Sequence, residues 1–74
     1  MMLKHFNEAI QDATRAIQLD KENTWAYNTR AEAYLQIERY KEAILDATVA
    51  IQLDPSDPVG YGTRAEAYRM MGNW

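Results

Sequence analysis

The residues that could take part in chemistry are few, and His5 is the single histidine of the chain. It stands beside Phe6, with no second histidine to share a metal ion and no serine or cysteine in the neighbouring sequence. Catalysis by a nucleophile, or binding of a metal, needs several such groups at one place. We therefore assign His5 no catalytic or ligand role. The chain has no cysteine, which excludes disulfides, thiol catalysis and thiolate metal sites.

The carboxylates are spread along the chain and do not gather at one point. They include Glu8, Asp12, Glu32, Glu42, Asp46 and Glu66. A spread of this kind is typical of a solvated helix face or of ion-pair partners. The interval from Asp12 to Asp46 is the same as the interval from Arg30 to Arg64. We predict that these arginines pair with the aspartates across packed helices, in a structural role.

The segment from Asp54 to Pro58 contains two Asp-Pro pairs. It lacks the alternating oxygen ligands and the glycine of a calcium-binding loop, and turn and helix-cap chemistry explains it. Gly60 and Gly62 form no phosphate-binding motif, because no strand is expected upstream of them. We therefore expect no metal, no cofactor and no enzymatic activity.

The composition is that of a soluble, folded chain, since 47% of its 74 residues are apolar and 26% are charged. The net charge is −3 and the basic residues are not clustered, so nucleic acid is not an expected partner. The apolar opening, residues 1–3, is followed at once by Lys4 and is far shorter than the roughly 20 residues of a membrane span. We expect no membrane partner and an intracellular, cytoplasmic address.

An internal repeat is the main signal in the sequence. Residues 8–20 return as residues 42–54 with two changes, and residues 29–34 return without change as residues 63–68. Both echoes have the same offset, and Tyr27 is matched by Tyr61 at that offset too. Two separate segments that agree on one period indicate a repeat protein built from a small structural unit.

Apolar and small residues recur within the unit at helical spacing, and they predict an all-α chain. Tyr27, Ala31 and Tyr34 form one stripe, for example. We predict helices over 3–20, 24–37, 40–53 and 58–71. The connection between the second and third of these is too short for anything but an antiparallel helix pair. Asp57 followed by Pro58 predicts the start of the last helix, and Gly72 predicts its end.

The period and the residue pattern resemble the tetratricopeptide repeat family. The positions that carry the resemblance are Tyr27, Ala31, Tyr34, Tyr40, Ala43, Ala50 and Pro55. The chain departs from the family pattern at Glu38, where the turn glycine is usual, at Ala47, where a large side chain is usual, and at Arg30. The arginine looks like a subtype found in chaperone-associated members. The resemblance implies antiparallel helix pairs stacked as a right-handed superhelix.

Aligned to this family, residues 1–74 form a single array segment that is cut out of phase. Residues 3–20 match the second helix of one repeat, residues 24–57 match a full repeat, and residues 58–72 match the first helix of a third. Arrays of this kind need roughly three repeats and polar ends to be stable and soluble. We therefore expect either a piece of a longer array, or a chain whose helix 58–71 docks head-to-tail on helix 3–20 of another copy.

The resemblance also implies a concave groove, lined by the first helices of successive repeats, that binds a peptide or a partner helix. The groove positions are Trp25, Asn28, Thr29, Glu32, Gln36, Val59, Thr63, Glu66, Arg69 and Met70. One subfamily grips the C-terminal carboxylate of chaperones with Lys, Asn and Arg side chains. This chain has Thr29, Val59 and Thr63 at three of those places, so we expect no such clamp.

Two function hypotheses follow from the resemblance. The first is a protein-interaction scaffold within a co-chaperone-like or adaptor protein, and the second is a structural unit that assembles with its own copies. Trp25 is a candidate contact residue for a partner because aromatic residues dominate interface energetics. Trp74 occupies an aromatic packing position of the repeat, so we interpret it as core.

Overall fold

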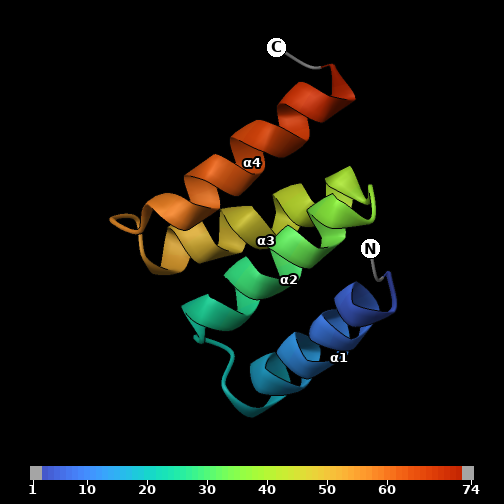
Figure 1. Ribbon diagram of the computed structural model, residues 1–74. Coiled ribbons are helices and arrows are strands. Elements are labelled where there is room, and N and C mark those ends of the chain that lie inside the picture. The colour runs from blue at the N-terminus through green and yellow to red at the C-terminus, as the bar shows by residue number, and fades with distance from the viewer. Residues whose placement is uncertain (1–2, 73–74) are drawn as a thin grey trace.

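The computed structural model describes residues 3–72 and contains four α-helices, with no strand in that range. They are α1 (Leu3–Leu19), α2 (Thr24–Gln36), α3 (Tyr40–Leu53) and α4 (Pro58–Met71). Each helix packs against the next in the sequence, and α2 also contacts α4 (Figure 1). The prediction of an all-α chain of stacked antiparallel helix pairs is confirmed, and the helix ends agree with the predicted ends to within one residue.

Short polar side chains set the starts of α2 and α4. The side chain of Asn23 accepts a hydrogen bond from the backbone N–H of Ala26 at 3.1 Å, and that of Asp57 accepts one from Val59 at 3.0 Å. Such caps satisfy N–H groups that have no partner inside the helix. At the other end of α4, Gly72 adopts a left-handed conformation with φ of 79°. The residues predicted to cap this helix therefore do so.

Alanine forms most of the core. The buried apolar residues are Ala13, Ala26, Ala31, Ala33, Ala43, Ala47, Ala50 and Ala67, none of them more than 4% exposed. Among the described residues, no large side chain is fully buried. Small side chains let neighbouring helix axes approach closely, because a bulky residue at the same place would hold them apart. The larger residues then pack around these seams with one edge in solvent.

The turn between α2 and α3 holds one residue in a strained conformation. Glu38 has a φ of 67°, in the left-handed region that favours glycine. The backbone N–H of Glu38 donates to Leu35 at 3.1 Å, and that of Arg39 donates to Tyr34 at 2.8 Å, so the turn closes the end of α2. Glu38 stands where the repeat pattern usually has glycine, and the structure shows why glycine is preferred there.

Replacing Glu38 with glycine is expected to raise the free energy of unfolding by about 1 kcal/mol, because a side chain in this conformation costs about that much. Urea unfolding of both proteins measures the difference. Glu38→Ala is the matched control, since it removes the same carboxylate but keeps a Cβ atom, and it should bring no gain. Equal effects of the two substitutions would show that the charge, and not the backbone, is the cause.

Candidate interaction groove

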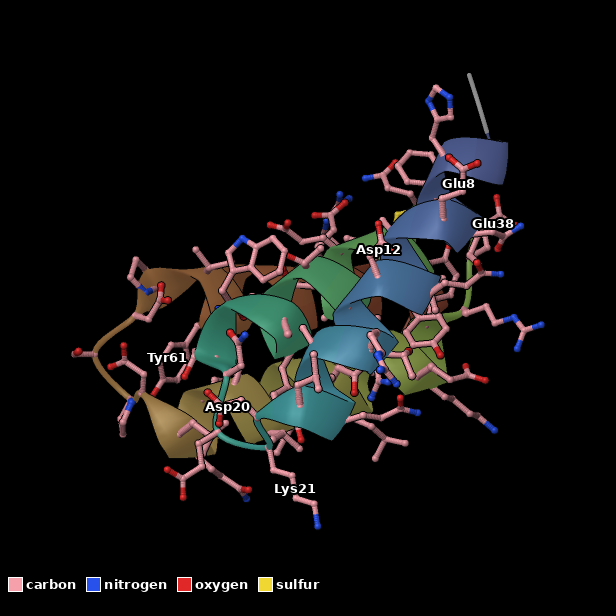
Figure 2. All side chains as sticks on the ribbon, turned by 90° about the horizontal axis from the view of Figure 1, so that it is seen from below. Glu8, Asp12, Asp20, Lys21, Glu38 and Tyr61 are labelled. Carbon is pink, nitrogen blue, oxygen red and sulfur yellow. The ribbon has the colours of Figure 1, made fainter. Side chains whose placement is uncertain are left out.

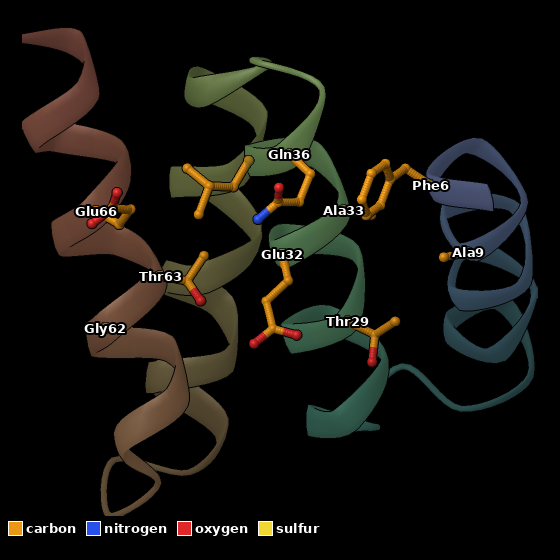
Figure 3. Close-up of a pocket in the computed structure, with 10 residues that line it drawn as sticks. Phe6, Ala9, Thr29, Glu32, Ala33, Gln36, Gly62, Thr63 and Glu66 are labelled. Carbon is orange, nitrogen blue, oxygen red and sulfur yellow. The ribbon is translucent and has the colours of Figure 1, made fainter. Parts of the chain in front are cut away.

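A groove of about 500 Å³ lies between α1, α2 and α4 (Figure 3). Its lining residues are Phe6, Ala9, Thr29, Glu32, Ala33, Leu35, Gln36, Gly62, Thr63 and Glu66. Thr29, Glu32 and Gln36 lie on one face of α2 because they follow each other at intervals of three and four residues. Thr63 and Glu66 lie in the same way on α4, so two helices present parallel rows of polar side chains.

The structure brings five of the ten predicted groove residues together in this lining. They are Thr29, Glu32, Gln36, Thr63 and Glu66. Met70 lines an adjoining hollow that shares Gln36 and Glu66 with the groove. Trp25 is 64% exposed and lies one helical turn before Thr29, and Val59 lies one turn before Thr63, so both extend these rows toward the helix starts.

Asn28 lies elsewhere, in the packed interior. It is only 6% exposed, and its side-chain amide donates to Asp57 Oδ2 at 3.4 Å. The same aspartate caps α4 through Val59. Asn28 thus ties α2 to the start of α4, and its side-chain oxygen has no hydrogen-bond partner among the described residues.

The two groove carboxylates differ in their surroundings. Glu66 accepts hydrogen bonds from the guanidinium of Arg69, one turn further along α4, so its charge is already balanced. Arg69 therefore contributes to the groove by binding Glu66. Glu32 has no ion-pair partner in the part of the chain that the structure describes. The free negative charge of the groove is concentrated at Glu32.

One side of the groove is provided by α1, and this side was not predicted from the sequence. Phe6 and Ala9 lie there, opposite Thr29 and Ala33 of α2 (Figure 3). The prediction took groove residues from the first helices of the repeats alone, and residues 3–20 were predicted to be a second helix. A signal for Phe6 was present, because Tyr40 stands one repeat period later and marks the same aromatic position.

An arginine bridge connects three helices behind the groove. Arg30 on α2 donates two hydrogen bonds to Asp46 on α3, at 2.7 and 2.9 Å, and a third to Thr14 on α1 at 3.0 Å. Its guanidinium also lies 5.9 Å from the ring centre of Tyr27. The hydrogen bonds to Asp46 raise the pKa of Arg30 further above its ordinary value, although burial acts in the opposite direction. The predicted pairing of Arg30 with Asp46 is confirmed.

The other two members of the predicted ion pairs, Arg64 and Asp12, do not meet. Arg64 donates to Thr48 at 3.2 Å, in the same way as Arg30 donates to Thr14, but no carboxylate of the described residues holds it. Asp12 is exposed and forms no ion pair within residues 3–72. In the bridge, the aspartate follows the arginine in the sequence, whereas Asp12 precedes both arginines. The prediction was therefore wrong for this second pair.

The remaining chemistry-bearing residues stay apart. His5 is exposed on the first turn of α1, and no group of three His, Asp or Glu side chains in residues 3–72 is arranged to hold a metal ion. No helix within that range is long and apolar enough to cross a membrane. Trp74, which was predicted to be core, lies outside the described residues.

Helix pairs that recur with one constant period, stacked side by side with a groove along their first helices, define an α-helical solenoid. The family described as Tetratricopeptide repeat matches residues 1–45, more than half of the chain, and the chain belongs to this family. The comparison with curated proteins gave no match. Repeats of this family mediate contacts between proteins and are not themselves catalytic.

Proposed function

We propose that this chain is a protein-interaction module, part of an adaptor or co-chaperone-like protein, that holds a peptide or a partner helix in the groove between α1, α2 and α4. In this proposal α1 is the second helix of one repeat, α2 and α3 form a full repeat, and α4 is the first helix of the next. Trp25, Val59 and Met70 extend the contact surface beyond the central lining.

The observation that carries the proposal is the set of polar groups without internal partners in the groove. Glu32 and Gln36 make no side-chain hydrogen bond to any described residue, although they lie one turn apart on the same face. An extended peptide presents backbone N–H and C=O groups at short intervals, which such side chains can bind. Phe6 adds an apolar wall beside them. The groove thus combines apolar surface with a few polar groups, as ligand sites do.

The charge of the groove selects the kind of segment that fits. Because Glu32 is unpaired among the described residues while Glu66 is held by Arg69, a lysine or arginine of the partner is expected to lie against Glu32. Thr29, Val59 and Thr63 provide no positive charge at the places where a carboxylate clamp would need it. An acidic C-terminal chaperone peptide is therefore expected to bind poorly to these residues.

Peptides selected from a displayed random library are expected to carry a basic residue next to an apolar one. Glu32→Arg should weaken their binding by about tenfold or more, because a hydrogen bond to a charged group is replaced by repulsion. Fluorescence anisotropy with a labelled selected peptide measures the change. An acidic C-terminal peptide, measured in parallel, should bind weakly to the unmodified protein.

Glu22→Arg is the matched control for that experiment. It makes the same change of charge in the exposed turn between α1 and α2, away from the groove lining, and should leave binding unchanged. Equal losses for the two variants would indicate a general charge effect and would contradict binding in the groove. Micromolar binding of the acidic peptide would contradict the predicted charge preference.

A further inference from the structure

The outer face of α4 is uncovered in the described structure. This face, named here the α4 outer face, consists of Tyr61, Arg64, Ala65 and Tyr68. Tyr61, labelled in Figure 2, is 44% exposed, and Tyr68 is 42% exposed. The same residue types stand one repeat earlier on α2, where α3 packs against them and Ala31, which matches Ala65, is 0% exposed. The α4 outer face therefore has the composition of a packed surface, and no helix within residues 3–72 covers it.

A second face lies on α1 and consists of Ala9, Asp12 and Ala16, named here the α1 outer face; Asp12 is exposed, and the two alanines are half-buried. Its residues match Ala43, Asp46 and Ala50 of α3, all of which are buried. Asp46 is 6% exposed, whereas Asp12 lies on the exposed surface of α1 (Figure 2). The α1 outer face is therefore a copy of the surface that α3 presents to α2.

The contact of α2 with α3 is thus an internal template for joining these two faces. In the template, Arg30 holds Asp46 with two hydrogen bonds at 2.7 and 2.9 Å. Arg64 matches Arg30, and its guanidinium is already placed by Thr48 and by the ring of Tyr61, 6.0 Å away. Asp12 matches Asp46. Arg64 on one face and Asp12 on the other have opposite charges. Each occupies the same repeat position as its counterpart in the template.

We propose that a second copy of this chain packs its α1 outer face on the α4 outer face, with Arg64 of the first copy holding Asp12 of the second copy. The arrangement continues the repeat from one molecule to the next, and its two contact surfaces are different, so it is a head-to-tail contact. Apart from Ala9, which also lines the central groove, its residues lie outside that groove. The ion pair fixes the register, and the tyrosines and alanines of the two faces supply the apolar contact area.

One part of α1 has no equivalent in the template. The helix α3 begins at Tyr40, which matches Phe6, whereas α1 begins three residues earlier at Leu3. The first turn of α1 therefore lies at the end of the contact, next to the last turn of α4 of the neighbouring copy. The matched positions, from Ala9 to Ala16, lie beyond this turn.

Sedimentation velocity of the 74-residue chain, across the micromolar to millimolar range, tests this contact. The unmodified chain is expected to increase in mass with concentration. Asp12→Ala and Arg64→Ala should each shift this association to concentrations about 100-fold higher, because each leaves a charge unpaired in the contact. Glu22→Ala and Arg39→Ala change the same charges at exposed positions outside both faces and should have no effect.

A mixture of the two interface variants gives the decisive result. The Asp12→Ala variant keeps its α4 outer face and the Arg64→Ala variant keeps its α1 outer face, so an equimolar mixture should form a one-to-one dimer and nothing larger. A contact between two identical faces would not give this pattern. A mixture that stays monomeric, or an unmodified chain that stays monomeric at every concentration, would overturn the proposal and would assign the faces to other occupants.

Circular dichroism of each variant keeps the test independent of folding. Arg64 contacts Thr48 within the molecule, so its replacement could disturb α4, but Asp12 is exposed and its replacement should leave the helical signal unchanged. If the Asp12→Ala variant associates as strongly as the unmodified chain, the register of the contact proposed here is wrong. Neither Asp12 nor Arg64 lines the groove, so peptide binding can be measured separately for each variant.

Discussion

Replacing Arg30 with leucine is expected to lower the free energy of unfolding by about 3 kcal/mol. The substitution leaves the carboxylate of Asp46, a residue only 6% exposed, without the two hydrogen bonds that balance its charge. Removing one partner of a buried pair costs about 3 to 5 kcal/mol, and the lower end applies because the Arg30 side chain keeps 20% exposure. Urea unfolding followed by circular dichroism measures the change.

Two further variants separate charge from packing in that experiment. Arg64→Leu is the matched control, because Arg64 stands in the same place on α4 and leaves no described carboxylate unbalanced. It should cost much less. The double variant Arg30→Leu/Asp46→Leu removes both charges and should recover much of the lost stability. A double variant as unstable as Arg30→Leu would mean that the ion pair itself is not the source of the loss.

Replacing Gly60 with valine is expected to lower the free energy of unfolding by about 2 kcal/mol, the range for overpacked cores. A Cβ atom added at Gly60 would lie 3.0 Å from Cγ1 of Ile51 and 3.1 Å from the backbone oxygen of Ala47. The side chain of Ile51 can shift, but the oxygen belongs to the backbone of α3 and cannot move alone. The two helices must therefore separate, with loss of contact along the alanine seam. Thermal unfolding measures the effect.

Gly62, two residues further along the same helix, is the control for this substitution. A Cβ atom at Gly62 would meet nothing within 4 Å. Gly62→Ala should therefore raise the free energy of unfolding by about 0.5 to 1 kcal/mol, because glycine in a helix interior is unfavourable relative to alanine. If both variants lose stability, α4 tolerates no added side chain at either position. The close approach at Gly60 would then not explain the loss.

The fold could be predicted from the sequence because its signals are local. The repeat offset, the helical spacing of small residues and the caps at Asp57 and Gly72 each rest on short segments, and they agree with one another. The pairing of Arg30 with Asp46 was also predictable from the sequence. The repeat alone could not tell which arginine meets which aspartate, since the choice depends on how adjacent helices are shifted along their axes.

The groove was predicted only in part, because its shape depends on contacts between repeats. Asn28 has the spacing of a groove residue, but its side-chain amide donates a hydrogen bond to the capping residue Asp57 and lies in the interior. Phe6 was missed because it belongs to α1, whose place beside α2 appears only when the helices are stacked. Each difference comes from a neighbour that is distant in sequence, and a pattern read along one helix does not contain that information.

The arginine bridge has a mechanical consequence for the solenoid. A guanidinium is planar and rigid, and that of Arg30 is fastened on one side to a hydroxyl of α1 and on the other to a carboxylate of α3. Rotation of either helix about its own axis would strain one of these attachments, so the bridge opposes independent rotation of α1 and α3. Because the bridge reaches across α2, a force that turns α1 is resisted by the attachment to α3 as well.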